Sequence, residues 1–495
     1  MKSLLTNRIR PLSLLLFAVP SLAVCVSAQT PQATPPPPSA PRTVQFPKPV
    51  EKTLPNGLRV VVVQRSELPL VSAQLLIKSG GEVDPVELSG VADMTASLLT
   101  RGTKTRSATE IAEQIEALGG SIGSSAGWDS SGATVGVTSS RFDSALGILA
   151  DVVRNPAFKD EEIERLRRQS LNNMKVLLGQ PGAIARFAAA RVVYRDAPYG
   201  HPLSGTPESL PRIKRDDIVR IHGMFYRPDN AILVIGGDMT PENGFALAQK
   251  YFGDWVKPAA DLPKIVVGTP SSEPRNRRVV VIDMPDAGQA SVLAARTAIN
   301  RDSPDYFRGI VSNAVLNGYS GRLNWEIRVK RGLSYGAGST LDTRRWAGSF
   351  SASAQTKNES GAQVTALTLG EISKLATGDL PDKELTTRKA SLNGGFARAL
   401  ETTNGLVAQV SSLAIYGVSF DQLNQFAGNV QAVKAEDVKG FAARHLNIDS
   451  TSVIVVGDAK KFLPALQKEF PQIEVIPLTE LDLNSASLRR AVSKN

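Results

Sequence analysis

The chain has 495 residues, with 57 basic and 47 acidic side chains, a formal net charge of +10 and one cysteine. A single cysteine excludes an internal disulfide framework and a metal site built from several thiolates. The basic residues are spread along the chain without a block that is interleaved with aromatics, so the sequence does not predict a nucleic-acid-binding surface.

The first 28 residues have the organisation of a secretory signal peptide. Three basic residues precede an apolar run over 12–26, which ends in Val26-Ser27-Ala28, an A-x-A-like cleavage site. The run is too short to predict a membrane span, and no later stretch of about 18 uncharged apolar residues predicts one. We therefore expect an exported, periplasmic protein. A lipid anchor at Cys25 is the less favoured alternative, because a valine precedes it where a lipoprotein signal has a small residue.

The segment after the leader predicts a tether. Residues 29–49 include four consecutive prolines and little that could be buried, which is typical of an extended linker. Folded structure is expected from Val50 onward. Over 400 residues follow, and one hydrophobic core seldom serves so many, so we expect at least two domains.

An internal repeat indicates where the domains divide. Residues 58–62 (LRVVV) are echoed at 277–281 (RRVVV), and residues 226–238 (YRPDNAILVIGGD) at 446–458 (LNIDSTSVIVVGD). The offsets are 219 and 220 residues, and two matches at nearly one spacing indicate duplication. We therefore predict an N-terminal domain over 50–256, a proline-containing linker over 257–276, a C-terminal domain over 277–480, and a tail over 481–495 whose polar residues from Asn484 on fray.

The first copy of the repeat mixes strands and helices in an order typical of α+β domains. The expected fold class is α+β, with two homologous domains that each pack a mainly antiparallel sheet with helices. β-branched content and alternation predict strands over 60–63, 73–77, 132–137 and 231–235, and apolar periodicity predicts helices over 90–100, 107–118, 140–154, 160–178 and 215–225.

The first of these helices carries a resemblance to a known family. Residues 90–103 (GVADMTASLLTRGT), which follow 80–85 (GGEVDP), resemble the insulinase/pitrilysin family of inverted zinc peptidases. In that family the same frame carries H-x-x-E-H, with two histidine ligands and a glutamate as general base. The spacing matters because residues i and i+4 share a helix face. The resemblance extends over about 52–470 and implies the family's fold.

The residues that would hold zinc are missing from this frame. The three motif positions are Asp93, Ala96 and Ser97, and Asn173 stands where the family has its third ligand, a glutamate on a later helix. Catalytic zinc needs three protein ligands and an open position, which a single carboxylate cannot provide. We therefore predict a degenerate zinc site, with no metal and no other cofactor in this chain.

The chain has only three histidines, His201, His222 and His445, and no two of them have helical ligand spacing. His201 lies in a Tyr-Gly-His-Pro segment that resembles a family loop of structural role. We expect all three histidines at the surface or in local hydrogen bonds.

The second copy retains a different family signature at 321–335 (GRLNWEIRVKRGLSY). Arg328 and Tyr335 resemble the family's R-x6-Y pair, which reaches the catalytic centre from the C-terminal domain. Gly332 predicts the end of a helix, and a strand is expected from near Tyr335, so both side chains could face one cleft. Arg328 would then donate to peptide carbonyls, and Tyr335 to the oxygen that gains charge in the transition state.

The residues alone leave a structural alternative open, in which Arg328 pairs with Glu326 or Asp342 and Tyr335 packs at a strand edge. In the family, one bacterial branch divides the work between a zinc-bearing chain and a chain that has the Arg/Tyr pair and a degenerate motif. Resemblance to the second kind implies a non-catalytic subunit that grips an extended peptide along a strand edge.

The partner implied by this resemblance is an insulinase-family chain carrying H-x-x-E-H, which would supply zinc, base and water. No integral membrane segment is expected after signal cleavage, and no proteolysis by the chain alone. The alternative function is a stand-alone peptide-binding scaffold or assembly protein of the cell envelope. An autonomous zinc peptidase conflicts with the missing ligands.

Overall fold

The structure, a computed structural model, describes residues 45–265 and 277–490. The described residues belong to one compact unit that begins at Gln45. The predicted signal peptide, the tether up to residue 44 and the linker segment 266–276 lie outside the described residues. No single helix in the described ranges is long and apolar enough to cross a membrane. Two consecutive helices, Asp160–Leu177 and Pro181–Tyr194, meet the combined length and hydropathy criteria only when taken together, and they are bent by 104°.

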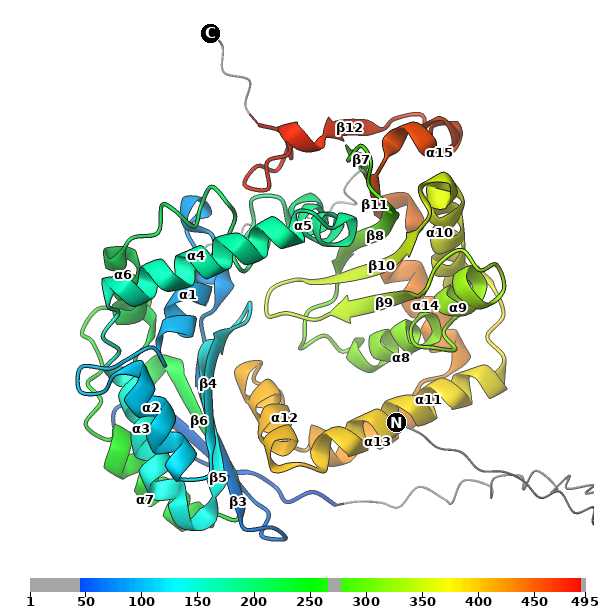
Figure 1. Ribbon diagram of the computed structural model, residues 1–495. Helices are drawn as coiled ribbons and strands as arrows, with labels where there is room; N and C mark the ends of the chain where they lie inside the picture. The colour runs from blue at the N-terminus through cyan, green and yellow to red at the C-terminus, as the bar shows by residue number, and fades with distance from the viewer. Residues whose placement is uncertain (1–44, 266–276, 491–495) are drawn as a thin grey trace, which may run out of the picture. The chain divides into compact units, whose positions relative to one another are not determined.

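Two six-stranded mixed sheets form the framework of the structure (Figure 1). The strand order is β1-β2-β6-β3-β5-β4 in the first sheet and β12-β7-β11-β8-β10-β9 in the second. The strands are β1 (Val50–Thr53), β2 (Arg59–Gln64), β3 (Leu70–Ile77), β4 (Ser121–Ala126), β5 (Ser131–Thr138), β6 (Ala231–Gly237), β7 (Val279–Asp283), β8 (Ala290–Ala298), β9 (Ala337–Asp342), β10 (Gly348–Thr356), β11 (Ser452–Gly457) and β12 (Glu474–Pro477).

The duplication inferred from the sequence is visible in the strand register. Val60 of β2 pairs with Leu233 of β6 in a parallel ladder. The residues 219 and 220 positions further along, Val279 of β7 and Val453 of β11, pair in the same way. Strands that correspond in sequence therefore occupy corresponding places in the two sheets.

The four strands and five helices expected in the first copy are all confirmed, with ends shifted by a few residues, and so is the α+β fold class. The helices are α1 (Val91–Leu98), α2 (Ala108–Ala117), α3 (Phe142–Arg154), α4 (Asp160–Leu177), α5 (Pro181–Tyr194), α6 (Arg215–Phe225), α7 (Pro241–Phe252), α8 (Tyr306–Leu316), α9 (Arg322–Asn324), α10 (Gly361–Thr377), α11 (Asp382–Leu400), α12 (Thr403–Ile415), α13 (Gln422–Ala432), α14 (Ala435–His445) and α15 (Leu463–Glu469).

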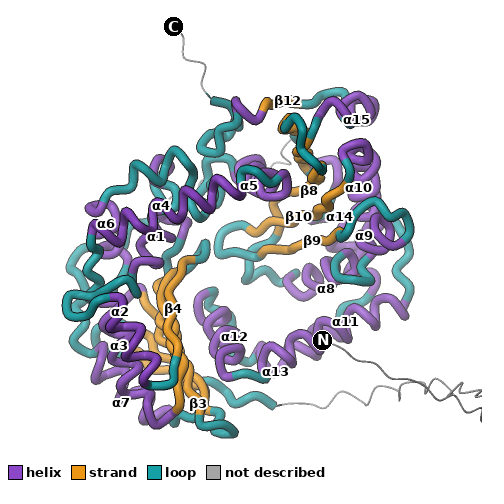
Figure 2. Tube along the Cα trace, in the orientation of Figure 1, coloured by secondary structure: helices purple, strands orange, loops and turns teal. Residues whose placement is uncertain are grey.

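Alternate residues of the central strands enter two different cores, as the two-residue period of a strand requires. Val60 and Val62 of β2 belong to the core that α1 and α3 cover, whereas Val61 and Val63 belong to a core that includes Val407 of α12. Figure 2 shows α2, α3 and α7 on one side of the first sheet and α12 on the other. Each central strand is thus buried on both faces.

The two copies exchange helices. α12, from the second copy, packs on β3 and β6 of the first sheet, and α5, from the first copy, packs on β8 and β11 of the second. Ile184 and Val192 of α5 share a core with Leu293 of β8 and Ile454 of β11. The predicted boundary divides the sequence into two copies, but two of the hydrophobic cores contain residues from both copies.

Both ends of the described chain are held more firmly than the sequence predicts. The expectation of a fraying tail is wrong for residues 484–490, because Leu488 is fully buried in the core that contains α5. The last residues of the predicted extended tether, 45–49, contact the folded unit. There the Asn424 side chain accepts from the Phe46 amide at 2.8 Å and donates to the Phe46 carbonyl at 3.0 Å. Leu488 and Phe46 pack against residues that are distant in the sequence, and these contacts hold two segments whose own sequences are mostly polar.

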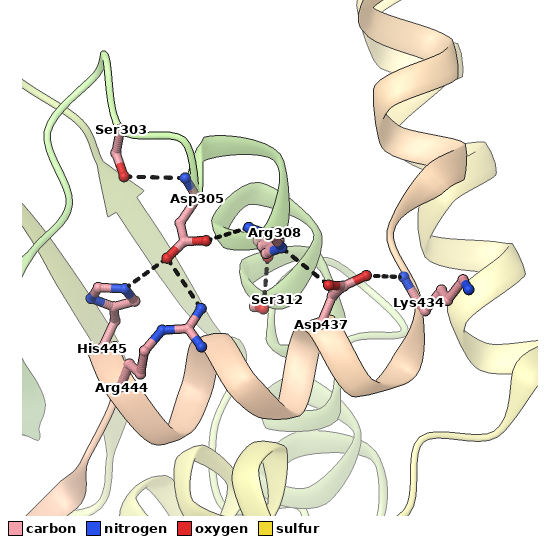
Figure 3. A network of polar contacts seen from close by, with 8 residues as sticks. All are labelled: Ser303, Asp305, Arg308, Ser312, Lys434, Asp437, Arg444 and His445. Atoms are coloured by element: carbon pink, nitrogen blue, oxygen red, sulfur yellow. Dashed lines mark hydrogen bonds and ion pairs between the residues drawn. The ribbon is translucent and has the colours of Figure 1, made fainter.

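A polar network joins the start of α8 to both ends of α14 (Figure 3). The Asp305 carboxylate accepts from Arg308 at 2.7 Å, and from Arg444 and His445 at 3.1 Å each. Arg308 also donates to Asp437 at 3.1 Å. Burial opposes the charged form of Asp305, but the bonds from Arg308, His445 and Arg444 outweigh it and lower its pKa to about 2. The network fixes α8, which packs on β9.

A second polar cluster joins the two copies at the turn between β9 and β10. The Arg345 guanidinium donates to the Lys78 carbonyl at 3.1 Å, to the Glu82 carboxyl at 3.2 Å and to the Asp129 carbonyl at 2.7 Å. The Glu82 side chain is completely buried, and burial raises its pKa to about 8 although Arg345 favours the charged form. The Asp129 carboxylate also accepts from Tyr416, next to α12, at 2.9 Å.

Replacing Asp305 by asparagine (Asp305→Asn) tests the network of Figure 3. The folded pKa of Asp305 is below its unfolded value, so its contribution to stability is present above about pH 4 and lost as the pH falls through 2. Because Arg308 and Arg444 are about half exposed, we expect a loss of only about 1 kcal/mol at pH 7. Urea unfolding at pH 7 and pH 3 measures it, and Glu113→Gln, an exposed carboxylate on α2, is the control. A loss of equal size at both pH values contradicts the assignment.

Arg345→Ala tests the contact between the copies. The change removes the donor to the Lys78 and Asp129 carbonyls and to the buried Glu82 carboxyl, and buried acceptors that are left without a hydrogen bond are destabilising. We expect the free energy of unfolding to fall by about 2–3 kcal/mol, since Arg345 keeps some exposure. Lys250→Ala, which removes an exposed pair with Asp143, should cost less than about 0.5 kcal/mol. Equal effects of the two changes would show that Arg345 does not join the copies.

Candidate functional site

The helix that carries the degenerate motif is held firmly at its N-terminus. The Asp84 carboxylate accepts from the amides of Gly90, at 2.7 Å, and Ala92, at 2.9 Å. Gly90 has a left-handed φ of 96°, and a Cβ on it would lie 2.7 Å from the Gly205 backbone. Glycine is therefore required for α1 to start here. The family-like segments 80–85 and 90–103 thus meet around the first turn of α1.

The four predicted zinc-site positions do not form a zinc site. Asp93 and Ser97 are half-buried on α1, Ala96 is fully buried, and Asn173 is exposed on α4, which packs on α1. Burial raises the pKa of Asp93 to about 6, which disfavours the ionised form that a metal ligand needs. The set offers one carboxylate, one hydroxyl and one amide, without an imidazole. Zn²⁺ does not fit this donor set.

The histidines are held in local hydrogen bonds. His201 is buried, lies 3.0 Å from the Gly81 carbonyl and packs edge-on against Trp128. His222 lies 2.8 Å from a backbone carbonyl, and burial lowers its pKa to about 4. His445 belongs to the network of Figure 3. Within residues 45–265 and 277–490 there is no group of three or more His, Cys, Asp or Glu residues that could hold a metal ion.

The segment that carries the Arg/Tyr pair is a short helix that ends as predicted. α9 continues into a π-helical turn at Trp325–Val329, and Gly332 ends it with a left-handed φ of 63°. The following strand, β9, begins at Ala337, two residues later than expected. Tyr335 therefore lies in the connecting turn, and the residue is 89% exposed.

Arg328 does not make the ion pair that the structural alternative requires. Glu326 pairs with Lys330 and Arg331, and Asp342 pairs with Arg344. The Arg328 guanidinium lies instead over the exposed Tyr319 ring, 5.4 Å from its centroid. No carboxylate of the described residues lies within ion-pair distance of it. Its hydrogen-bond donors remain available to a ligand.

Tyr335 lines a pocket of about 330 Å³, whereas Arg328 is not among the residues that line it. The pocket lies where the N-terminal turns of α5 meet β8, β9 and β10. Its lining includes Arg186 of α5, a residue that the sequence interpretation missed. One signal was available, since Arg186 and Arg191 are the only charged residues in the otherwise apolar α5.

Each sheet ends in an edge strand, and Tyr335 lies two residues before one of them, β9. β4 ends the first sheet and β9 ends the second (Figure 1), so each has one unpaired row of backbone donors and acceptors. β4 has the sequence SIGSSA and alternates exposed and half-buried residues. Such edges can bind an extended peptide through main-chain hydrogen bonds.

Several known proteins are similar to this chain. An uncharacterized zinc protease of Mycobacterium leprae is 25% identical over 403 residues, 80% of this chain and 88% of that protein. One of Bacillus subtilis is 21% identical over 404 residues, 81% of this chain and 97% of that protein. A crystal structure of a peptidase M16 inactive domain from Pseudomonas fluorescens superposes with a TM-score of 0.77 at 26% identity, and covers 83% of this chain and 98% of that one.

Family models match two consecutive stretches. The model described as Insulinase (Peptidase family M16) matches residues 59–207, and the model described as Peptidase M16 inactive domain matches residues 212–392. The two stretches contain the α1 motif frame and the Arg328 and Tyr335 segment, respectively. The sequence matches, the duplicated fold and the motif frame agree, and this chain belongs to the insulinase family of peptidases.

Proposed function

We propose that this chain is the non-catalytic, substrate-gripping subunit of an exported zinc peptidase complex of the insulinase family. The observation that carries the proposal is the contrast between two sites. The zinc positions Asp93, Ala96, Ser97 and Asn173 do not fit a metal. By contrast, Arg328 has no carboxylate partner among residues 45–265 and 277–490, and Tyr335 is exposed beside a pocket.

The residues of this chain suit the handling of an extended peptide. Main-chain bonds to the edge of β4 or β9 would align the substrate with little dependence on its sequence. Arg328 would donate to a peptide carbonyl, and the Tyr335 hydroxyl would donate to the carbonyl oxygen as it gains negative charge. Zinc held by a partner chain with H-x-x-E-H would supply the Lewis acid and the activated water.

The proposed location of the complex is supported by the predicted leader. The basic residues, apolar run and cleavage site within residues 1–28 support export, and the proline-rich segment after them would separate the folded unit from the signal. We propose a periplasmic complex. Co-purification with a tagged H-x-x-E-H chain encoded by the same organism is the direct test of partnership.

The proposed role of Tyr335 predicts a kinetic defect in the assembled complex. Tyr335→Phe should lower kcat about 100-fold with a smaller change in KM, because the lost hydroxyl acts mainly in the transition state. Arg328→Ala should raise KM as well, because it holds the substrate before the reaction. Turnover of a quenched fluorescent peptide measures both, with Tyr306→Phe and Arg141→Ala as controls away from the pocket.

Unchanged turnover in the Arg328→Ala/Tyr335→Phe double variant would eliminate the assisting role. Peptide binding by the lone chain, together with a partner that cleaves equally well without it, would instead favour the stand-alone scaffold. These two outcomes separate a subunit of an enzyme from a peptide-binding protein.

The donor set also predicts the metal content. The purified chain should hold less than about 0.1 zinc per molecule after dialysis against micromolar zinc, measured by atomic emission, because one partly protonated carboxylate binds zinc weakly. The H-x-x-E-H partner, treated identically, should hold about one. Stoichiometric zinc in the lone chain, with peptide cleavage that a chelator abolishes, would overturn the non-catalytic assignment.

A further inference from the structure

The pocket beside Tyr335 is lined by one basic residue and no acidic residue. Its polar lining includes Arg186, Gln289, Ser291, Tyr335 and Gln355. The amides and hydroxyls are neutral donors and acceptors, so Arg186 gives the pocket a net positive charge. An anionic group is the complementary ligand.

Arg186 has no partner in the fold. Its side chain is exposed, and no described residue accepts a hydrogen bond or forms an ion pair with it. Arg191, one and a half turns further along α5, is the contrasting case. It is buried and donates to the Leu483 carbonyl at 3.1 Å and to the Arg195 carbonyl at 2.9 Å. The second arginine stabilises the fold, whereas the first keeps its donors free.

The exchange of helices places Arg186 beside Tyr335. α5 belongs to the first copy, yet it packs on β8 of the second sheet, and its N-terminal turns contribute Gly182 and Arg186 to the pocket. Gly182 lies close to β10, since a Cβ there would lie 2.5 Å from Nε2 of Gln355. Arg186 and Tyr335 thus line the same pocket. The packing of α5 on the second sheet places Arg186 there, and this packing does not depend on the Arg/Tyr motif.

We propose that this pocket is a carboxylate-binding subsite for the peptide substrate and that Arg186 is its specificity-determining residue. The inference rests on the proposed peptide-gripping function and adds a preference for peptides with a carboxylate near the bond that Tyr335 faces. A planar guanidinium binds a carboxylate through two parallel hydrogen bonds. The carboxylate can belong to an Asp or Glu side chain or to the peptide C-terminus.

The test measures binding of fluorescein-labelled nine-residue peptides to the full chain by anisotropy at low salt. Four probes combine a central Glu or Gln with a free or amidated C-terminus. We expect about tenfold tighter binding for the probe that presents the recognised carboxylate. Loss of affinity on Glu-to-Gln exchange identifies a side chain as its source, and loss on amidation identifies the C-terminus.

The variants assign the preference to one residue. Arg186→Ala should abolish the tenfold difference without changing the binding of the Gln, amidated probe, and Arg186→Lys should retain part of it. Arg141→Ala removes the same charge from an exposed, unpaired position on the first copy and should bind all four probes like the parent chain. Thermal melts check that each variant is folded. We expect all of them to fold, because the substituted side chains are exposed.

Two outcomes contradict the proposal in different ways. Equal binding of all four probes by the parent chain overturns the carboxylate subsite but leaves the peptide-gripping function intact. A preference that survives in Arg186→Ala overturns the role of Arg186. Failure of every probe to bind at millimolar concentration counts against both the subsite and the grip, and the kinetics of the Tyr335→Phe complex then decide the grip separately.

Discussion

The structure depends on the burial of both faces of each sheet. The central strands carry apolar residues at successive positions, as in Val60-Val61-Val62-Val63, and the helices that follow each sheet along the chain cover only one face. The second face is covered by a helix from the other copy, α12 for the first sheet and α5 for the second. Neither copy can bury its apolar surface alone, so the two copies fold as one unit.

Local features of the fold were predictable from the sequence, and long-range ones were not. The strand around Val60 and the helix around Leu171 follow from apolar periodicity, and the repeat gave the second sheet by analogy. The burial of Leu488 depends on α5, nearly 300 residues earlier in the chain, and that of Phe46 on α13. A polar local sequence predicts a loose end, and only the tertiary fold shows otherwise.

In the candidate site, too, some features were predictable from the sequence and others were not. The absence of zinc ligands at Asp93, Ala96, Ser97 and Asn173 is a matter of residue identity and needs no coordinates once the motif frame is recognised. Arg328 and Tyr335 were found by their motif, but the sequence could not show that Arg328 stacks on Tyr319. Arg186 belongs to no motif, and its place beside Tyr335 results from the helix exchange.

The composition of the β4 edge has a consequence for how long a bound strand would stay. Unpaired sheet edges invite irreversible assembly when their side chains can interdigitate tightly with those of an incoming strand. β4 offers mainly serine, glycine and alanine, which present little surface to lock together. A guest chain would gain backbone pairing without a dry interlocking interface, so residence should be brief, and self-association along this edge is disfavoured.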